Sequence, residues 1–254
     1  MSRVVAVAQS TLSEAIRHRI LYLLLIFALG MMLVSRFLSM MTVGDDVKII
    51  KDMGLTAINV FGLLVTLFVG VGLIFREMER RTVQTTLSTP IARWEHQMGK
   101  FLGLASAVTI NTVLMALGLF TILAFRGAFD MGLVAAVYML WVELMFITAG
   151  AVFFASFSTP IFSALFTAAL YVVGHLSWSL PLLENRLPIG GARTIVHEVY
   201  LLLPDLEYGD IRAEAVHGLP IPWDRVLTAS IYELSYAGLF LLVACLAFRK
   251  RDLV

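Results

Sequence analysis

The chain has 254 residues, of which 59% are hydrophobic and 15% charged, with a formal net charge of +1 and a mean hydropathy of +0.88. Soluble domains are about 45–50% apolar and about 25% charged. A disordered chain is excluded, because disorder requires low hydrophobicity and high net charge. Nucleic-acid binding is not expected without a dominant basic surface, and the single cysteine, Cys245, excludes a disulfide scaffold. The remaining class is an integral membrane protein with about six helical spans.

The pattern of apolar residues predicts an all-α, polytopic membrane protein with one transmembrane domain over residues 1–254. Residues 1–19 form an amphipathic pattern, which predicts a helix in the plane of the membrane interface. Six apolar runs follow, each long enough to cross the hydrocarbon core as a helix. They cover residues 20–41, 54–75, 101–125, 133–157, 160–182 and 226–248.

The distribution of charge predicts the orientation of these spans. Arginine and lysine gather in segments 1–19, 76–100 and 249–254, whereas the intervening connections are more acidic. Cytoplasmic segments of membrane proteins carry the excess of arginine and lysine. Both termini and the loop 76–100 are therefore expected in the cytoplasm, and the long connection 183–225 outside. Its stretch 194–203 fits a short helix that dips into the outer leaflet.

The cytoplasmic loop 76–100 contains a helix-start signal. Thr89 can cap a helix, and Pro90 suits the first helical position. This predicts a short helix from Pro90 to about His96, from which Arg93 and Trp94 would face the interface or a partner. The alternative is a simple connecting loop that arginine and tryptophan anchor at the membrane.

The sequence resembles the type-2, export-class permease subunits of ABC transporters over its whole length. That family carries an acidic residue after the second span, a Gly-Thr pair, a leucine-rich turn, Pro-x-x-Arg, and Gly-Lys at the start of the third span. The matching residues here are Glu77, Thr82, Leu87, Pro90, Arg93, Gly99 and Lys100. The chain departs from the pattern at Arg81, where the family usually has glycine. Segments 203–206, 210–212 and 248–253 also resemble the family, and the nearest group is the multicopper-enzyme and nitrous-oxide-reductase maturation permeases.

The resemblance implies a permease subunit of an ATP-driven exporter in the inner membrane. No phosphate-binding Gly-x-x-x-x-Gly-Lys-Ser/Thr motif occurs in the sequence. The chain is therefore not expected to be an enzyme or to bind a cofactor, and ATP and Mg would be held by a partner ATPase. That ATPase would dock on segment 1–19 and on the short helix from Pro90 to about His96, which would act as the coupling helix. The expected coupling residues are Glu77, Thr82, Pro90, Arg93, Trp94, Glu95, Gly99 and Lys100. A second permease copy, most simply in a homodimer, would complete the translocation path.

Four polar residues in the spans are candidates for that path: Asn59, Glu143, His175 and Glu233. Ionisable residues in spans are costly and usually face the interior of the bundle. We hypothesise a polar outer vestibule in which Glu143, His175 and Glu233 interact. The alternative is a set of contacts between helices that never meets substrate.

Two other functions stay open at this point. An intramembrane enzyme could use one of these residues for acid–base chemistry, although no nucleophile–base pair occurs at fixed spacing. A mechanical transmitter could act on a periplasmic partner bound at 183–225. The histidines of that connection have no metal-ligand spacing, so no metal site is predicted.

Overall fold

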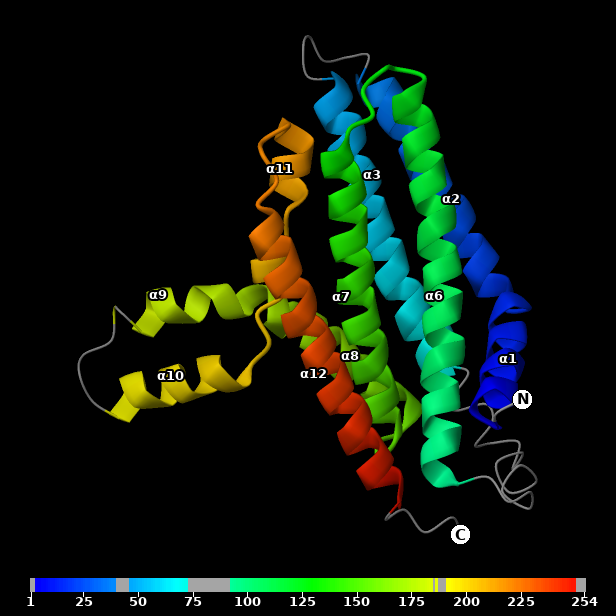
Figure 1. The fold of residues 1–254 in the computed structure, drawn as a ribbon, viewed down its shortest axis with the longest axis vertical. Helices are drawn as coiled ribbons and strands as arrows, with labels where there is room; N and C mark the ends of the chain where they lie inside the picture. The colour runs from blue at the N-terminus through cyan, green and yellow to red at the C-terminus, as the bar shows by residue number, and fades with distance from the viewer. Residues whose placement is uncertain (1–2, 40–45, 73–91, 185, 187–190, 250–254) are drawn as a thin grey trace.

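The computed structural model describes residues 3–39, 46–72, 92–184, 186 and 191–249, and this part of the chain is helical without a strand (Figure 1). The N-terminal helix α1 spans Arg3–Ile16. The long helices are α2 (Arg19–Ser39), α3 (Asp46–Val65), α6 (Arg93–Ala124), α7 (Met131–Ala155), α8 (Pro160–Leu176) and α12 (Trp223–Arg249). The shorter helices are the π-helix η1 (Thr66–Val71), η2 (Ser177–Ser179), α9 (Leu180–Glu184), α10 (Gly191–Leu202), η3 (Glu207–Gly209) and α11 (Arg212–His217).

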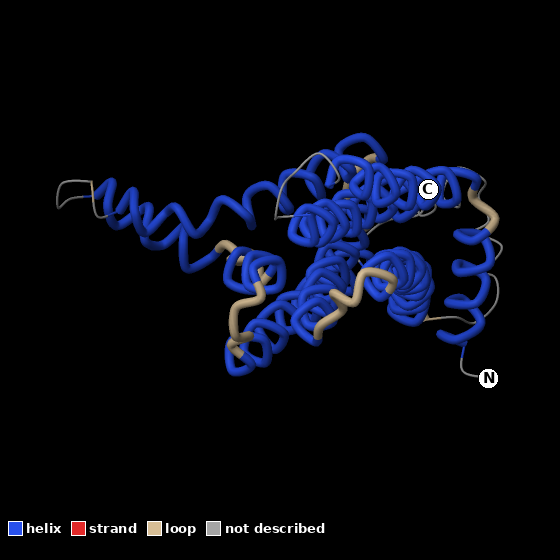
Figure 2. Tube along the Cα trace, turned by 90° about the horizontal axis from the view of Figure 1, so that it is seen from above, coloured by secondary structure: helices blue, strands red, loops and turns tan. Residues whose placement is uncertain are grey.

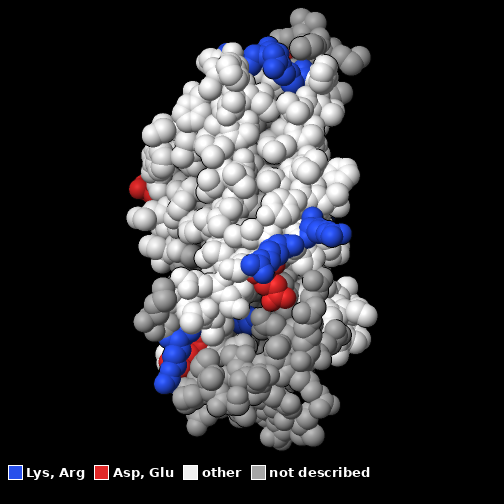
Figure 3. Space-filling model, turned by 90° about the vertical axis from the view of Figure 1, so that its right-hand side faces the viewer, with Lys and Arg blue, Asp and Glu red and all other residues white. Residues whose placement is uncertain are grey.

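The predicted all-α membrane fold is confirmed. Six helical stretches are long and apolar enough to cross a membrane: Arg19–Phe37, Asp46–Val71, Trp94–Ala124, Met131–Ala155, Pro160–Glu184 and Trp223–Ala247. Each overlaps one of the six predicted runs. The face formed by α1, α2 and α6 has a broad, almost uncharged zone between charged groups near its upper edge and in its lower half (Figure 3), as a lipid-facing surface requires.

Helix α7 is the centre of the bundle, because it packs against α3, α6, α8, α11 and α12. Apart from Glu143 it has no charged residue, and its apolar residues face all sides, as expected of a helix surrounded by others. Gly62 of α3 lets the Leu144 side chain of α7 pack directly on the α3 backbone, since this side chain occupies the place that a side chain at Gly62 would fill. The second span continues beyond α3 as the π-helix η1, whose Thr66 hydroxyl donates to the carbonyl of Gly62 at 3.1 Å.

Helix α6 corrects the predicted coupling helix. The segment from Arg93 to His96 is the first turn of α6, which continues without a break to Ala124. The predicted end at His96 is therefore wrong, because the backbone hydrogen bonds carry the helix through Lys100 into the apolar run. Thr89 and Pro90 lie outside the described residues, and Ala92 is the N-cap.

The predicted N-terminal helix is confirmed as α1, but its surroundings differ from a purely interfacial helix. Val7, Thr11 and Ala15 form a buried stripe at helical spacing, and α1 makes extensive contacts with the lower part of α6. Val5 and Ile16 of the same helix remain exposed and are available to lipid.

The fifth span covers the predicted run 160–182 but is not one continuous α-helix. Helix α8 stops at Leu176, and the turn η2 redirects the chain into α9. Helices α9 and α10 then form a hairpin that projects sideways from the bundle (Figures 1 and 2). The predicted short helix at 194–203 is confirmed as α10, whereas much of the remaining connection up to residue 217 folds back onto the bundle.

Candidate functional site

A polar group in the bundle joins α3, α7 and α8. The Asn59 amide nitrogen lies 3.4 Å from each carboxyl oxygen of Glu143, and the Tyr171 hydroxyl donates to Asn59 Oδ1 at 2.6 Å. His175 Nε2 lies 3.7 Å from Glu143 Oε1, which is an ionic contact if the histidine is protonated but too long for a hydrogen bond. Asn59 and Glu143 are both buried. The structure therefore brings together three of the four residues proposed for the path.

Tyr171 is the member of this group that the sequence reasoning missed. It lies one helical turn before His175 on the same face of α8, and His175 Nδ1 is 3.2 Å from its carbonyl oxygen. The signal in the sequence was its spacing, because Tyr171 lies four residues before His175, which was already a candidate.

A second polar group comes from the connection after α10, which the sequence analysis treated as external. Arg212 donates through Nε to both carboxyl oxygens of Asp210, at 3.0 and 2.8 Å, and through Nη2 to Oδ2. Burial opposes ionisation of Asp210, but these bonds outweigh it and hold the pKa of Asp210 below its ordinary value. For the same reason, and against the effect of burial, the pKa of Arg212 is raised. Both side chains therefore stay charged and form an ion pair.

The segment 203–211, here called the strap, is held in the bundle by contacts with α8 and α12. Leu206 donates its backbone N–H to the Gly174 carbonyl at 3.1 Å and fills the space beside that glycine. The Ser177 hydroxyl donates to the Pro204 carbonyl at 3.1 Å, and the Asp205 N–H donates to the Tyr232 hydroxyl at 3.0 Å.

Arg225 fastens the second half of the strap to the start of α12. It donates to the Tyr208 carbonyl at 2.8 Å and to the Asp210 carbonyl at 2.6 Å. Its Nη1 also donates to Glu214 in α11 at 3.1 Å. The strap is therefore a fixed wall of the polar region.

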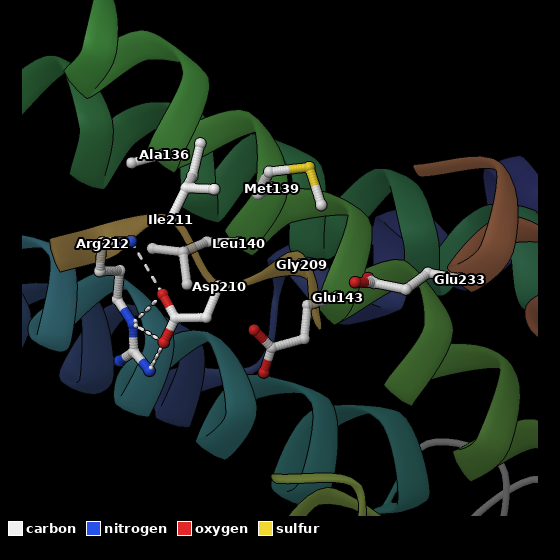
Figure 4. A pocket seen from close by; sticks show the side chains of 9 residues that line it. All are labelled: Ala136, Met139, Leu140, Glu143, Gly209, Asp210, Ile211, Arg212 and Glu233. Carbon is white, nitrogen blue, oxygen red and sulfur yellow. Dashed lines mark hydrogen bonds and ion pairs between the residues drawn. The ribbon is translucent and has the colours of Figure 1, made fainter. Parts of the chain in front are cut away.

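The strap, α7 and α12 enclose a small pocket that contains Glu233, the fourth residue proposed for the path (Figure 4). Its lining is Ala136, Met139, Leu140, Glu143, Gly209, Asp210, Ile211, Arg212 and Glu233. Glu233 is 2% exposed, and its Oε2 has no hydrogen-bond partner within the described part of the chain. The other oxygen, Oε1, occupies the place that a Cβ at Gly209 would take, so a larger residue there would have to displace the end of the Glu233 side chain.

A third polar contact ties the helix ends at the far end of the bundle from α1. The buried ammonium of Lys51 is paired with Asp130, the N-cap of α7, and donates to the Ala215 carbonyl of α11 at 3.2 Å. Although burial opposes the shift, the hydrogen bonds from Lys51 and from Leu133 N lower the pKa of Asp130. This contact joins α3, α7 and α11.

The coupling residues that the structure describes lie on the first turns of α6, at the opposite end of the bundle. Glu77, Thr82 and Pro90 lie outside the described residues, and Arg93 begins α6. Trp94 on the first turn of α6 is 55% exposed, whereas Lys100 is buried. The Glu95 carboxylate accepts from the Ala92 N–H at 2.9 Å and so caps the helix.

Glycines at the base of α6 let α1 approach closely. A Cβ at Gly99 would lie 2.6 Å from Val7 Cβ and 3.0 Å from the Val4 carbonyl oxygen. A Cβ at Gly103 would lie 2.5 Å from Thr11 Cβ and 2.7 Å from the Ala8 carbonyl oxygen. Gly99 thus has a packing role in addition to its place in the family pattern.

Within the described residues, six helices that are long and apolar enough to cross a membrane pack around a polar interior, and together with the N-terminal helix seated on the base of one span they define a multi-pass membrane protein. Comparison with protein families identifies which one: residues 5–253 match the ABC-2 family transporter protein, and the chain belongs to this family. It is therefore a membrane permease component of an ABC transporter, and the family implies an ABC ATPase as partner. A comparison with curated proteins finds no match. Among the described residues, no group of three or more His, Cys, Asp or Glu is arranged to hold a metal.

Proposed function

We propose that the chain is the permease of an ATP-driven exporter, with both termini in the cytoplasm and an ATPase bound at the base of α6 and α1. The observation that carries the proposal is the contact of α1 with Gly99 and Gly103. Because the two helices meet backbone to backbone, a displacement of the 76–100 region by the ATPase would move α1 and the third span together. Trp94, exposed on the first turn of α6, is available for the ATPase.

The polar interior supports a translocation path that this movement would open. Glu143, Asn59 and His175 lie between α3, α7 and α8, so relative movement of these helices changes their contacts. A second copy of the chain is proposed to complete the path as a homodimer in the inner membrane. Closer kinship with the multicopper-enzyme and nitrous-oxide-reductase maturation permeases is part of the same proposal and rests on the sequence pattern.

The test is isolation of the tagged chain from its native membrane, followed by mass spectrometry of what accompanies it. An ABC ATPase in stoichiometric amount is expected with the natural chain and should be lost from the double variant Arg93→Glu, Glu95→Arg. Glu198→Arg, a charge reversal on the exposed α10, is the matched control and should retain the ATPase. A chain that purifies without an ATPase in all three forms would contradict the proposal.

A second function is favoured by the α9–α10 hairpin, which projects from the bundle while the strap that follows it is bonded to α8 and α12. Movement of the spans would therefore reach the hairpin directly. In this reading the permease transmits force to a periplasmic protein bound at 183–225. The same isolation separates the two functions, because deletion of residues 186–197 should release a periplasmic protein and leave the ATPase bound.

A further inference from the structure

The pocket beside the strap contains a carboxyl group whose charge the surrounding residues leave unbalanced. Glu233 is buried and has an oxygen without a hydrogen-bond partner among the described residues, although it lines the pocket together with Glu143 (Figure 4). A buried carboxylate persists only beside a positive charge or as the neutral acid. Arg212, the one cation among the nine residues of the lining, is already bound to Asp210 through two of its nitrogens.

Glu143 reinforces this deficit of positive charge. Its donors from Asn59 are long, at 3.4 Å, and His175 approaches no closer than 3.7 Å. Asp210 also lines the pocket, but its charge is balanced by Arg212. The pocket thus offers two glutamates and holds no cation of its own that is not already paired.

The size of the pocket restricts what could balance these carboxylates. It has room for about one water molecule, which excludes an organic cation. A divalent ion such as Ca²⁺ takes about six to eight oxygen ligands, and the described residues contain no cluster of three or more metal-binding side chains. A monovalent ion of about the size of water fits the available space, and it needs less negative charge around it than a divalent ion.

We infer that this pocket binds one small monovalent cation between Glu143 and Glu233. The ion would balance one of the two buried carboxylate charges, with the other glutamate neutral as the protonated acid, and would join α7 to α12 beneath the strap. The inference goes beyond the proposed export function and does not depend on it, because cation binding is measured on the permease without its ATPase.

The test is equilibrium binding of radioactive sodium to the purified full chain in lipid nanodiscs, with choline chloride keeping the ionic strength constant. Saturable binding of a single ion per chain is expected. Glu233→Gln should weaken it by more than about tenfold, since loss of even an outer-shell partner typically weakens an ion site by about 10–100-fold. The control Glu198→Gln removes an exposed carboxylate of α10 and should leave binding unchanged.

The competing occupant is a proton, and the same variants distinguish it. Absence of saturable sodium binding, or equal binding by a folded Glu233→Gln chain, would overturn the inference. So would an infrared band of a protonated carboxyl that disappears in Glu233→Gln and does not respond to sodium. If Glu233→Gln fails to fold, Gly209→Ala provides a second test, because its Cβ would displace the Glu233 carboxyl and should also weaken sodium binding. A folded Gly209→Ala chain with unchanged affinity would contradict the site.

Discussion

Replacing Gly103 by alanine should push α1 away from the base of α6. The new Cβ would lie 2.5 Å from Thr11 Cβ and 2.7 Å from the Ala8 carbonyl oxygen, both far inside van der Waals contact. The second atom belongs to the backbone, so a change of side-chain rotamer cannot relieve the clash. Overpacking of this kind costs about 1–3 kcal/mol. The balance between seated and displaced α1 should therefore shift by about 5- to 150-fold.

Two readouts follow this shift in the permease–ATPase complex: the unfolding temperature, and the amount of ATPase that accompanies the chain. Both should fall in Gly103→Ala. The matched control is Gly30→Ala in α2, where a Cβ meets nothing within 4 Å and where alanine favours the helix. If Gly103→Ala matched Gly30→Ala in both readouts, the argument that α1 is seated on α6 by glycine contacts would be refuted.

Three further perturbations test the polar contacts. Tyr171→Phe removes the donor to the buried Asn59 Oδ1 and should lower the free energy of unfolding by about 1–3 kcal/mol. Thermal unfolding measures this effect against the control Tyr138→Phe, which changes an exposed tyrosine. Equal stability of the two variants would contradict the prediction. Lys51→Met leaves Asp130 and the Ala215 carbonyl without their partner. The free energy of unfolding should fall by about 3–5 kcal/mol, reduced by solvent screening of the half-exposed Asp130. Limited proteolysis should therefore cut α11 faster, and unchanged protease resistance would contradict the prediction. Because the pKa of Asp210 is lowered on folding, its stabilising effect is present above the ordinary value of about 3.9 and is lost as the pH falls through the lower folded value. An acid-unfolding series should therefore be less steep for Asp210→Asn than for the natural chain, and parallel curves would argue against the ion pair.

The six spans could be predicted from the sequence because each is a long apolar run, and length and hydropathy alone decide such helices. The boundary at the base of α6 could not. Residues from Arg93 to Lys100 are polar, so hydropathy places them outside the span, while the backbone hydrogen bonds continue through them. Polarity reports contact with water, whereas helix continuity depends on local hydrogen bonding.

The candidate site was predicted in part for a similar reason. Asn59, Glu143, His175 and Glu233 stand out because ionisable and amide groups are rare in spans. The strap does not stand out, because its place in the bundle depends on long-range packing of Leu206 on Gly174 and of Gly209 on Glu233. Each of these contacts joins residues more than 20 positions apart, a distance over which no periodic pattern operates.

The measurement that tests the account most directly is crosslinking from position 94 to the ATPase. With the single native cysteine replaced by Cys245→Ser, Trp94→Cys places one thiol on the exposed first turn of α6. The account predicts a covalent adduct between this thiol and an ABC ATPase in native membranes, and no such adduct from Glu198→Cys on α10. Failure of Trp94→Cys to form the adduct, with adduct formation from Glu198→Cys instead, would place the ATPase at the α9–α10 hairpin and contradict the account.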